Sequence, residues 1–315
     1  MSRCWLALTP DRPWAHSVSI YALRMASRLL LLIMGFWHVE VSGRENMGRR
    51  DEPRVFVSNH ISYVEILFFL AEMGPSFVMK RTCLQVPFVG DIAARILGSV
   101  SVDNTGGKEG GSGSQAIAAR LQLMFGATTL ANWQANVTQC SAAEGNGDGM
   151  HRKLALHKEH YETKAETWAR GWRGNPLLLF PEGTTSNGSC VLRFKTGVFS
   201  GGMPVYPVTV QYDYRRFSPA FESILTSVHM FRMLAEPANH LRVKFLPRYC
   251  PTPEQRVNRA AYATAVQGVL CDALGLPAAD SGYSEKVKYH KYLLRQFQEH
   301  PWGKAAFLLP APDRH

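Results

Sequence analysis

Long apolar runs are scarce in this chain of 315 residues. The most apolar run, Leu29 to Trp37, is bounded by Arg28 and His38 and falls well short of the about 20 residues that span a membrane. Towards Ala15 it is interrupted by arginines and flanked by aromatic residues of the kind found at membrane interfaces. We predict that residues 15–37 form an amphipathic helix that lies in or dips into one leaflet, with an ordinary buried core helix as the alternative.

Closely spaced cysteines are also missing. The six cysteines are widely separated, and no two of them have the C-x-x-C spacing of a zinc site or a redox pair. We therefore predict no bound metal and no disulfide framework, but reduced thiols that face the cytosol.

Charged residues make up only 19% of the chain and hydrophobic residues 46%, a balance typical of globular proteins. The net charge of +10 nevertheless favours an anionic partner, such as a membrane, a phosphorylated substrate or nucleic acid. No zinc-finger spacing, aromatic RNA-binding signature or basic zipper is present, so we predict no nucleic-acid partner. Several basic residues mixed with apolar ones suit a surface facing lipid head groups, or else a plain solvated face. These are Arg215, Arg216, Arg232, Arg242, Lys244 and Arg248.

Two glycine-rich segments lack the features of a phosphate loop or a nucleophile elbow. Residues 106–113 are not followed by G-K-[ST], and residues 110–114 do not match G-x-S-x-G because they end in Ser114. We interpret residues 106–150 as a glycine-rich insertion in which a helix lies between two flexible loops.

Elsewhere, short apolar runs alternate with longer amphipathic segments, which predicts an α/β fold with a mostly parallel sheet flanked by helices. The predicted strands are residues 55–58, 76–79, 99–102, 177–180, 205–211 and 241–246. The predicted helices are residues 64–72, 88–97, 114–125, 153–170, 221–234 and 253–274. We divide the chain into an N-terminal membrane-associating segment (1–45), the α/β domain (46–275) and a basic, helical C-terminal segment (276–315).

A first motif, Asn59-His60-Ile61-Ser62-Tyr63-Val64-Glu65, directly follows the predicted strand 55–58. On one helix the His60 and Glu65 side chains would point about 140° apart. They can meet only if His60 lies on the turn after the strand and Glu65 lies in the first turn of the next helix. There Glu65 would fix the imidazole tautomer and leave the other ring nitrogen facing a substrate. The pair is a candidate general-base unit, with a locally satisfied histidine as the alternative.

A second motif, Phe180-Pro181-Glu182-Gly183-Thr184-Thr185, follows the predicted strand 177–180. Proline cannot donate to the ladder, so Pro181 ends the strand. The turn then offers a carboxylate, a glycine and two hydroxyls at the carboxyl edge of the sheet, where parallel α/β sheets bind ligands. We expect both motifs to share one cleft, with Glu182 paired to Arg193 as the structural alternative.

These motifs resemble the N-H-x-x-x-x-D and F-P-E-G-T motifs of the glycerolipid acyltransferases. Between them, residues 78–81 and 87–90 resemble that family's middle segment, and residues 98–104 resemble its second motif. Residues 205–208 resemble its fourth motif. The run 180–212 is most similar to the eukaryotic lysophospholipid acyltransferases, which act on lysophosphatidylcholine or lysophosphatidylethanolamine.

The resemblance implies that residues 46–275 are an acyltransferase domain that moves an acyl group from acyl-CoA, a co-substrate, to a free hydroxyl of a lysophospholipid. No other cofactor is implied. It implies a catalytic base, His60, oriented by Glu65, and acceptor binding by Glu182, Gly183, Thr184, Thr185, Lys80 and Arg81. It also implies attachment to membrane lipid at the endoplasmic reticulum, with the site facing the cytosol. The alternatives are a lysophosphatidic acid or glycerol-3-phosphate acceptor, and a non-catalytic membrane-binding homologue.

Two positions depart from the family pattern. Glu65 stands in place of Asp, which changes the intrinsic pKa only from about 3.9 to about 4.3 but adds a methylene of reach. Asn104 stands in place of an arginine that meets the acceptor's phosphate. Four residues are candidates to supply that charge: Lys80, Arg81, Arg95 and Lys195.

Overall fold

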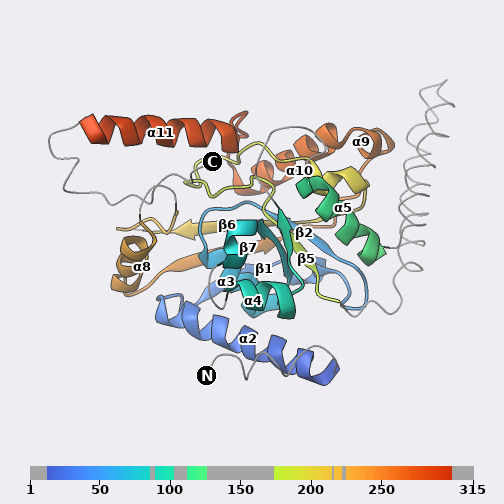
Figure 1. The fold of residues 1–315 in the computed structure, drawn as a ribbon, viewed down its shortest axis with the longest axis horizontal. Helices are drawn as coiled ribbons and strands as arrows, with labels where there is room; N and C mark the ends of the chain where they lie inside the picture. The colour runs from blue at the N-terminus through green and yellow to red at the C-terminus, as the bar shows by residue number, and fades with distance from the viewer. Residues whose placement is uncertain are drawn as a thin grey trace.

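A computed structural model describes residues 13–85, 89–102, 112–125, 174–214, 216–221 and 225–299. Its centre is a seven-stranded sheet with the strand order β1-β7-β6-β2-β5-β3-β4 (Figure 1). The strands are β1 (Val39–Ser42), β2 (Val55–Ser58), β3 (Ser76–Lys80), β4 (Val100–Val102), β5 (Leu177–Leu179), β6 (Tyr206–Asp213) and β7 (His240–Phe245).

The sheet is mixed but mostly parallel, as the sequence predicts. Strands β2 to β6 pair in parallel, β7 runs antiparallel to β6, and β1 is parallel to β7. The carboxyl ends of β2, β5 and β6 therefore meet at one edge, on the side where α8 (Thr226–Ala235) lies in Figure 1. This is the edge that carries both motifs.

The central strands are buried on both faces, which explains their unbroken apolar sequences. In β2 and β5 the register pairs Val55 with Leu177 and Val57 with Leu179. Because successive side chains alternate between faces, these four enter one core layer, whereas Phe56 and its partner Leu178 enter the other.

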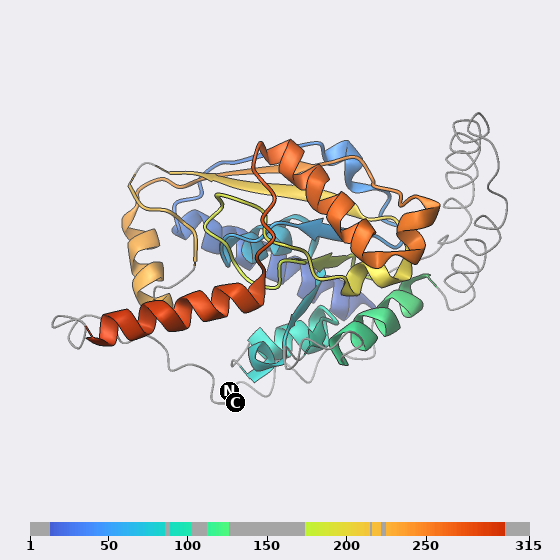
Figure 2. The same cartoon turned by 90° about the horizontal axis from the view of Figure 1, so that it is seen from above.

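Helices cover the two core layers from opposite sides (Figures 1 and 2). On one side lie α2 (Pro13–Ile33) and α3 (Val64–Met73). On the other lie α5 (Ser112–Phe125), α9 (Pro253–Val257) and α10 (Arg259–Leu274). The part of the chain that the structure describes also contains the short α4 (Val89–Asp91), a π-helix at Ile92–Ile96, 3₁₀ turns at Arg44–Met47, Arg81–Gln85 and Gly197–Gly201, and α11 (Tyr283–Glu299).

The N-terminal helix packs through one side only. Leu31 is buried in the core, and the Arg24 guanidinium donates to the backbone oxygens of Ala71 and Glu72 at the end of α3, at 3.0 and 2.7 Å. Its stretch His16–Ile33 has a mean hydropathy of 1.2 and is 11% buried, long and apolar enough to cross a membrane. A core helix or a signal sequence can pass the same test of length and composition.

The observed elements differ from the predicted ones in several places, two of which have local causes. Strand β1 was not predicted, because its alternating half-buried and exposed residues form no apolar run. The predicted helix 253–274 breaks at Asn258, whose side chain accepts from the Ala260 and Ala261 amides and starts α10. The predicted helix 221–234 begins only at Thr226.

Part of the predicted insertion belongs to the core. Helix α5 lies within residues 106–150, and its Ile117, Leu121 and Met124 are buried in the same layer as β5. The flanking glycine-rich loops, the helix predicted at 153–170, Asn104 and the tail beyond 299 lie outside the described residues.

Candidate active site

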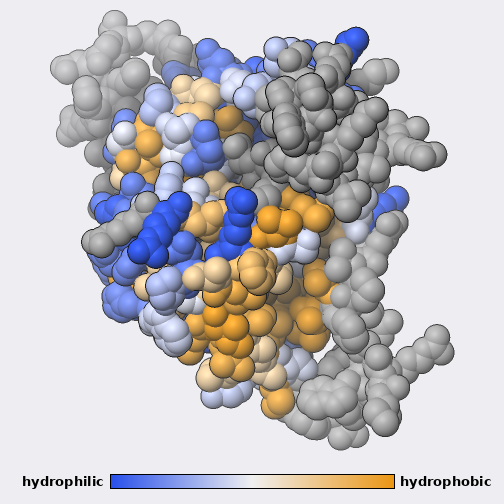
Figure 3. Space-filling model, turned by 90° about the vertical axis from the view of Figure 1, so that its left-hand side faces the viewer, coloured by the Kyte–Doolittle hydropathy of each residue, from blue (hydrophilic) through white to orange (hydrophobic). Residues whose placement is uncertain are grey.

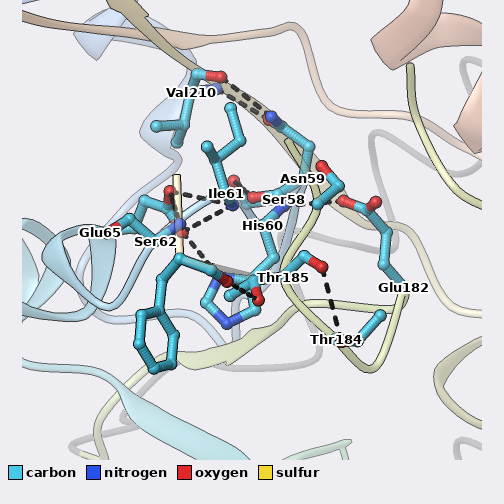
Figure 4. A network of polar contacts seen from close by, with 12 residues as sticks. Ser58, Asn59, His60, Ile61, Ser62, Glu65, Glu182, Thr184, Thr185 and Val210 are labelled. Atoms are coloured by element: carbon cyan, nitrogen blue, oxygen red, sulfur yellow. Dashed lines mark hydrogen bonds and ion pairs between the residues drawn. The ribbon is translucent and has the colours of Figure 1, made fainter. Parts of the chain in front are cut away.

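His60 and Glu65 form a close pair at the end of β2. The Nδ1 atom of His60 lies 2.6 Å from Oε2 of Glu65 (Figure 4). His60 is on the turn after the strand and Glu65 is in the first turn of α3, so the predicted arrangement is confirmed. Because a carboxylate only accepts, Nδ1 carries the proton and the Nε2 lone pair is left for another group.

The Glu65 carboxylate also binds the backbone of the turn that precedes α3. Oε1 accepts from the amides of Ser62 at 2.7 Å and Ile61 at 3.0 Å. The side chain is fully buried, and a negative charge at a helix N-terminus is stabilised by the helix dipole. The extra methylene of glutamate is therefore taken up within the turn, and the carboxylate reaches both the backbone and the imidazole.

Two neighbours fix the turn and the ring. The Asn59 amide donates to the Val210 oxygen at 2.9 Å and accepts from the Val210 amide at 2.8 Å, which ties the motif to β6. The His60 ring stacks on Phe180, with centroids 4.0 Å apart and an interplanar angle of 15°. The imidazole is thus held between a carboxylate at its edge and an aromatic ring on its face.

Glu182 joins the two motifs through the backbone. Its Oε1 accepts from the His60 amide at 2.7 Å, and its Oε2 accepts from the Leu192 amide at 3.1 Å. The carboxyl is fully buried, and burial raises its pKa to about 8 against these hydrogen bonds, which lower it. Arg193 lies 3.8 Å from Glu285 instead. In this structure Glu182 acts on the site by holding the His60 backbone.

The rest of the second motif folds over the first. The Ser186 amide donates to the His60 oxygen at 2.7 Å, and the Gly183 amide donates to the Phe180 oxygen at 3.0 Å. The Thr185 hydroxyl donates to the backbone oxygen of Phe221, and the Thr184 hydroxyl lies 3.5 Å from the Thr185 oxygen. The two motifs therefore form one site, as the sequence predicts (Figure 4).

Two lysines converge beside this loop. The ammonium groups of Lys80 and Lys195 lie 4.8 and 5.1 Å from the centroid of the Tyr283 ring. Gly183, with a φ of +69°, lets the Lys195 ammonium approach the backbone closely, because a Cβ at this position would lie 2.6 Å from Lys195 Nζ and the lysine end would have to shift. Burial and the charge of Lys80 lower the pKa of Lys195. Arg81 is exposed at the start of its 3₁₀ turn, and the Arg95 side chain lies outside the described residues.

Sequence reasoning missed two contributions from distant segments. At the start of α11, the Tyr283 hydroxyl accepts from the Lys80 ammonium at 3.3 Å, and the Lys286 ammonium donates to the Thr185 oxygen. From α8, the buried His229 lies 3.1 Å from the Tyr63 hydroxyl, within the first motif. The only available signal for α11 was its basic composition.

The described residues hold no group of three or more His, Cys, Asp or Glu side chains placed to bind a metal ion. The site is instead an imidazole with a buried carboxylate, beside a pair of cationic side chains. This combination can remove a proton from a hydroxyl and hold an anionic substrate close by.

Comparisons with known proteins identify the family and several relatives of this chain. The family model described as Acyltransferase matches residues 38–211, which include both motifs. Lysophospholipid acyltransferase LPEAT1 of Arabidopsis thaliana is 29% identical over 302 residues, which cover 89% of this chain and 65% of the relative. Lysophospholipid acyltransferase LPCAT4 of Xenopus tropicalis is 35% identical over 269 residues, which cover 82% of this chain and 41% of the relative. The chain thus spans less than two thirds of these curated relatives.

A solved structure is also similar. The crystal structure of the 1-acyl-sn-glycerophosphate (LPA) acyltransferase PlsC from Thermotoga maritima aligns with a TM-score of 0.49 and 16% identity. The alignment covers 86% of this chain and 84% of that one.

Proposed function

Because this chain belongs to the acyltransferase family, we propose that it transfers an acyl group from acyl-CoA to a free hydroxyl of a lysophospholipid. The observation that carries the proposal is the 2.6 Å contact between His60 Nδ1 and Glu65, which leaves Nε2 as a base. The relatives named as lysophospholipid acyltransferases support this class of acceptor.

His60 is the general base of the proposed reaction. Nε2 takes the proton of the acceptor hydroxyl as its oxygen attacks the thioester carbonyl and forms the new C–O bond. The tetrahedral intermediate collapses, the C–S bond breaks, and the CoA sulfur leaves with that proton. A thiol with a pKa of about 8.5 leaves readily, so the step uses one base and neither a metal nor another cofactor.

Glu65 and Phe180 support the protonated imidazole. Glu65 sits at hydrogen-bonding distance from Nδ1 and stabilises the positive charge that forms when Nε2 is protonated. The face of Phe180 lies against the ring and adds a cation–π contribution. Backbone N–H groups at the two turns stabilise the oxyanion.

The acceptor's phosphate is bound by Lys80 and Lys195, next to Gly183. Their two ammonium groups lie against one ring, and an anion between them relieves their repulsion. These lysines take over the role of the motif arginine that is replaced by Asn104. Thr184 and Thr185 line the glycerol part, Arg81 contributes charge at the rim, and Glu182 serves through the His60 backbone.

The acceptor is a membrane lipid, so the enzyme works at a membrane. The outer side of α2 exposes Val18, Tyr21, Met25 and Leu29, which supports contact with a leaflet. We place the protein at the endoplasmic reticulum with its site facing the cytosol, where acyl-CoA is present.

The proposal is tested by acyl transfer in vesicles. The full chain is incubated with acyl-CoA and a panel of lysophospholipids, lysophosphatidic acid and glycerol 3-phosphate. We expect transfer to lysophospholipids, its loss in His60→Ala, and wild-type rates in His38→Ala, an exposed histidine used as the control. The absence of acyl transfer to every acceptor in the panel would favour a non-catalytic membrane-binding homologue. Full activity of His60→Ala would show that His60 is not the base.

A further inference from the structure

Helix α8 exposes apolar residues on its outer side although it is also apolar on its inner side. His229 and Met233 face the protein and are fully buried. Val228, Met230, Phe231 and Leu234 are exposed, and Phe231 is 74% accessible to solvent. Phe231 is among the most exposed large hydrophobic side chains of the described residues, so this surface calls for a covering partner.

The end of α2 continues this apolar surface. The Trp37 indole donates to the Pro237 oxygen at 2.8 Å, just after α8 ends. Asn239 also connects these two segments. Its side-chain amide donates to the Met34 oxygen at 2.8 Å, and its backbone N–H donates to the Gly35 oxygen at 2.8 Å. Figure 3 shows the side of the molecule where α8 lies, with apolar residues gathered in its lower half and strongly hydrophilic ones above them.

Basic and aromatic side chains accompany the apolar ones. Arg232 is exposed on α8, Arg216 precedes that helix, and Arg28 is exposed near the end of α2. Trp37 and Tyr214 are 66% and 56% exposed and are of the kind that prefers the lipid head-group region. An apolar helix face accompanied by arginines, on a chain of net charge +10, complements an anionic phospholipid leaflet.

We propose that α8 inserts its Val228–Leu234 face into the same anionic phospholipid leaflet as the exposed side of α2. The proposal depends on the proposed function in one respect only, namely that the acceptor is a membrane lipid. Two elements far apart in the sequence then form one docking surface, held rigid by the hydrogen bonds of Trp37 and Asn239.

The position of α8 gives this contact a role in the reaction. The helix follows β6, whose carboxyl end lies at the edge of the sheet that carries both motifs. Its His229 contacts Tyr63 of the first motif at 3.1 Å, and the Phe221 amide just before it donates to the Ile61 oxygen at 2.9 Å. A lysophospholipid leaving the leaflet beside α8 thus arrives next to His60.

Photo-crosslinking of the full chain in vesicles tests the proposal without any use of catalytic activity. Phe231 is replaced by p-benzoyl-phenylalanine, which keeps its aromatic, apolar character, and the protein is irradiated in phosphatidylcholine vesicles with and without phosphatidylserine. Val257, 70% exposed on α9 at the other side of the molecule, is the matched control, and Tyr21 on the outer side of α2 is the reference. Mass spectrometry identifies the adducts.

We expect phospholipid adducts at position 231 in yields similar to those at 21 and several-fold above those at 257, with a gain when phosphatidylserine is present. Adducts between two copies of the chain at position 231 would make the surface a dimer interface and overturn the proposal. Lipid adducts at 21 without any at 231 would overturn it as well. If no acyl transfer is detected but lipid adducts form at position 231, the proposed reaction is wrong and the proposed membrane contact of α8 still holds.

Discussion

One carboxylate oxygen of Glu182 lies 2.7 Å from the backbone nitrogen of His60, and the other lies 3.1 Å from that of Leu192. The turn that presents the imidazole is therefore held from behind by a buried acid in the turn that follows the neighbouring strand β5. Because both oxygens bind backbone amides, a substitution of Glu182 affects the reaction by changing the position of His60.

The buried Glu182 gives the protein a particular dependence on pH. Its pKa is raised from 4.5 to about 8, mainly by burial, so the folded chain keeps a proton that the unfolded chain has already lost. Between these values the folded state binds more protons, and the free energy of unfolding falls as the pH rises. One such group contributes a slope of about 1.4 kcal/mol per pH unit. Urea unfolding between pH 5 and pH 8 measures it.

Glu182→Gln removes this titration, and we expect its stability to fall less steeply over the same range. Glu254→Gln, at an exposed position on α9, is the control and keeps the wild-type slope. Parallel pH profiles for the wild type and Glu182→Gln would contradict the prediction.

A second prediction concerns Gly183 and its contact with Lys195. Alanine at position 183 meets two obstacles, the φ of +69° and a Cβ that would lie 2.6 Å from Lys195 Nζ. Gly275 has a φ of +66° with nothing within 4 Å, so Gly275→Ala isolates the backbone strain. We expect each variant to lose about 1 kcal/mol of stability, and only Gly183→Ala to raise KM for the lysophospholipid, by about tenfold. Equal KM values in both variants would show that Lys195 does not contribute to binding of the lysophospholipid.

A third prediction follows from His229. Nε2 lies 3.1 Å from the Ala220 oxygen, and Nδ1 lies 3.1 Å from the Tyr63 hydroxyl, so the neutral ring donates through Nε2 and accepts through Nδ1. Burial is the main cause that lowers its pKa below 6.5, with a smaller contribution from Arg232. On acidification the unfolded chain takes up the proton first, so the free energy of unfolding falls as the pH drops below about 6.5.

His229→Gln can form both hydrogen bonds but does not titrate. Its melting temperature is therefore expected to fall less than that of the wild type between pH 7 and pH 5. His240→Gln, an exposed position at the start of β7, is the control. An unchanged acid sensitivity in His229→Gln would show that other groups cause it.

The sequence predicts those parts of the site that lie close together along the chain. The spacing of His60 and Glu65 fixes where each must lie relative to the strand end, and the apolar runs place both motifs at one edge of a parallel sheet. It cannot predict contacts between segments that only the fold brings together. Lys80 meets Tyr283 across 203 positions, and Tyr63 meets His229 across 166.

The sequence of a motif also does not reveal which of its side chains are buried. The carboxyl group of Glu182 resembles a ligand for a substrate when only the turn is considered, yet both its oxygens accept from amides of the chain. Likewise, β1 carries no apolar run because it is an edge strand with alternating exposure, and only its pairing with β7 identifies it.

The last prediction concerns the glutamate of the first motif. Glu65 reaches the His60 Nδ1 at 2.6 Å and the Ser62 amide at 2.7 Å from the first turn of α3. Aspartate at this position would draw the carboxylate back by about one C–C bond and weaken charge-assisted hydrogen bonds worth about 1.5–3 kcal/mol. We expect Glu65→Asp to lower kcat by about 10- to 100-fold, whereas Glu72→Asp, at the other end of α3, leaves it unchanged. A gain in rate would instead mean that the catalytic turn is built for the shorter acid, and that the fit of Glu65 in this structure is not the one used in turnover.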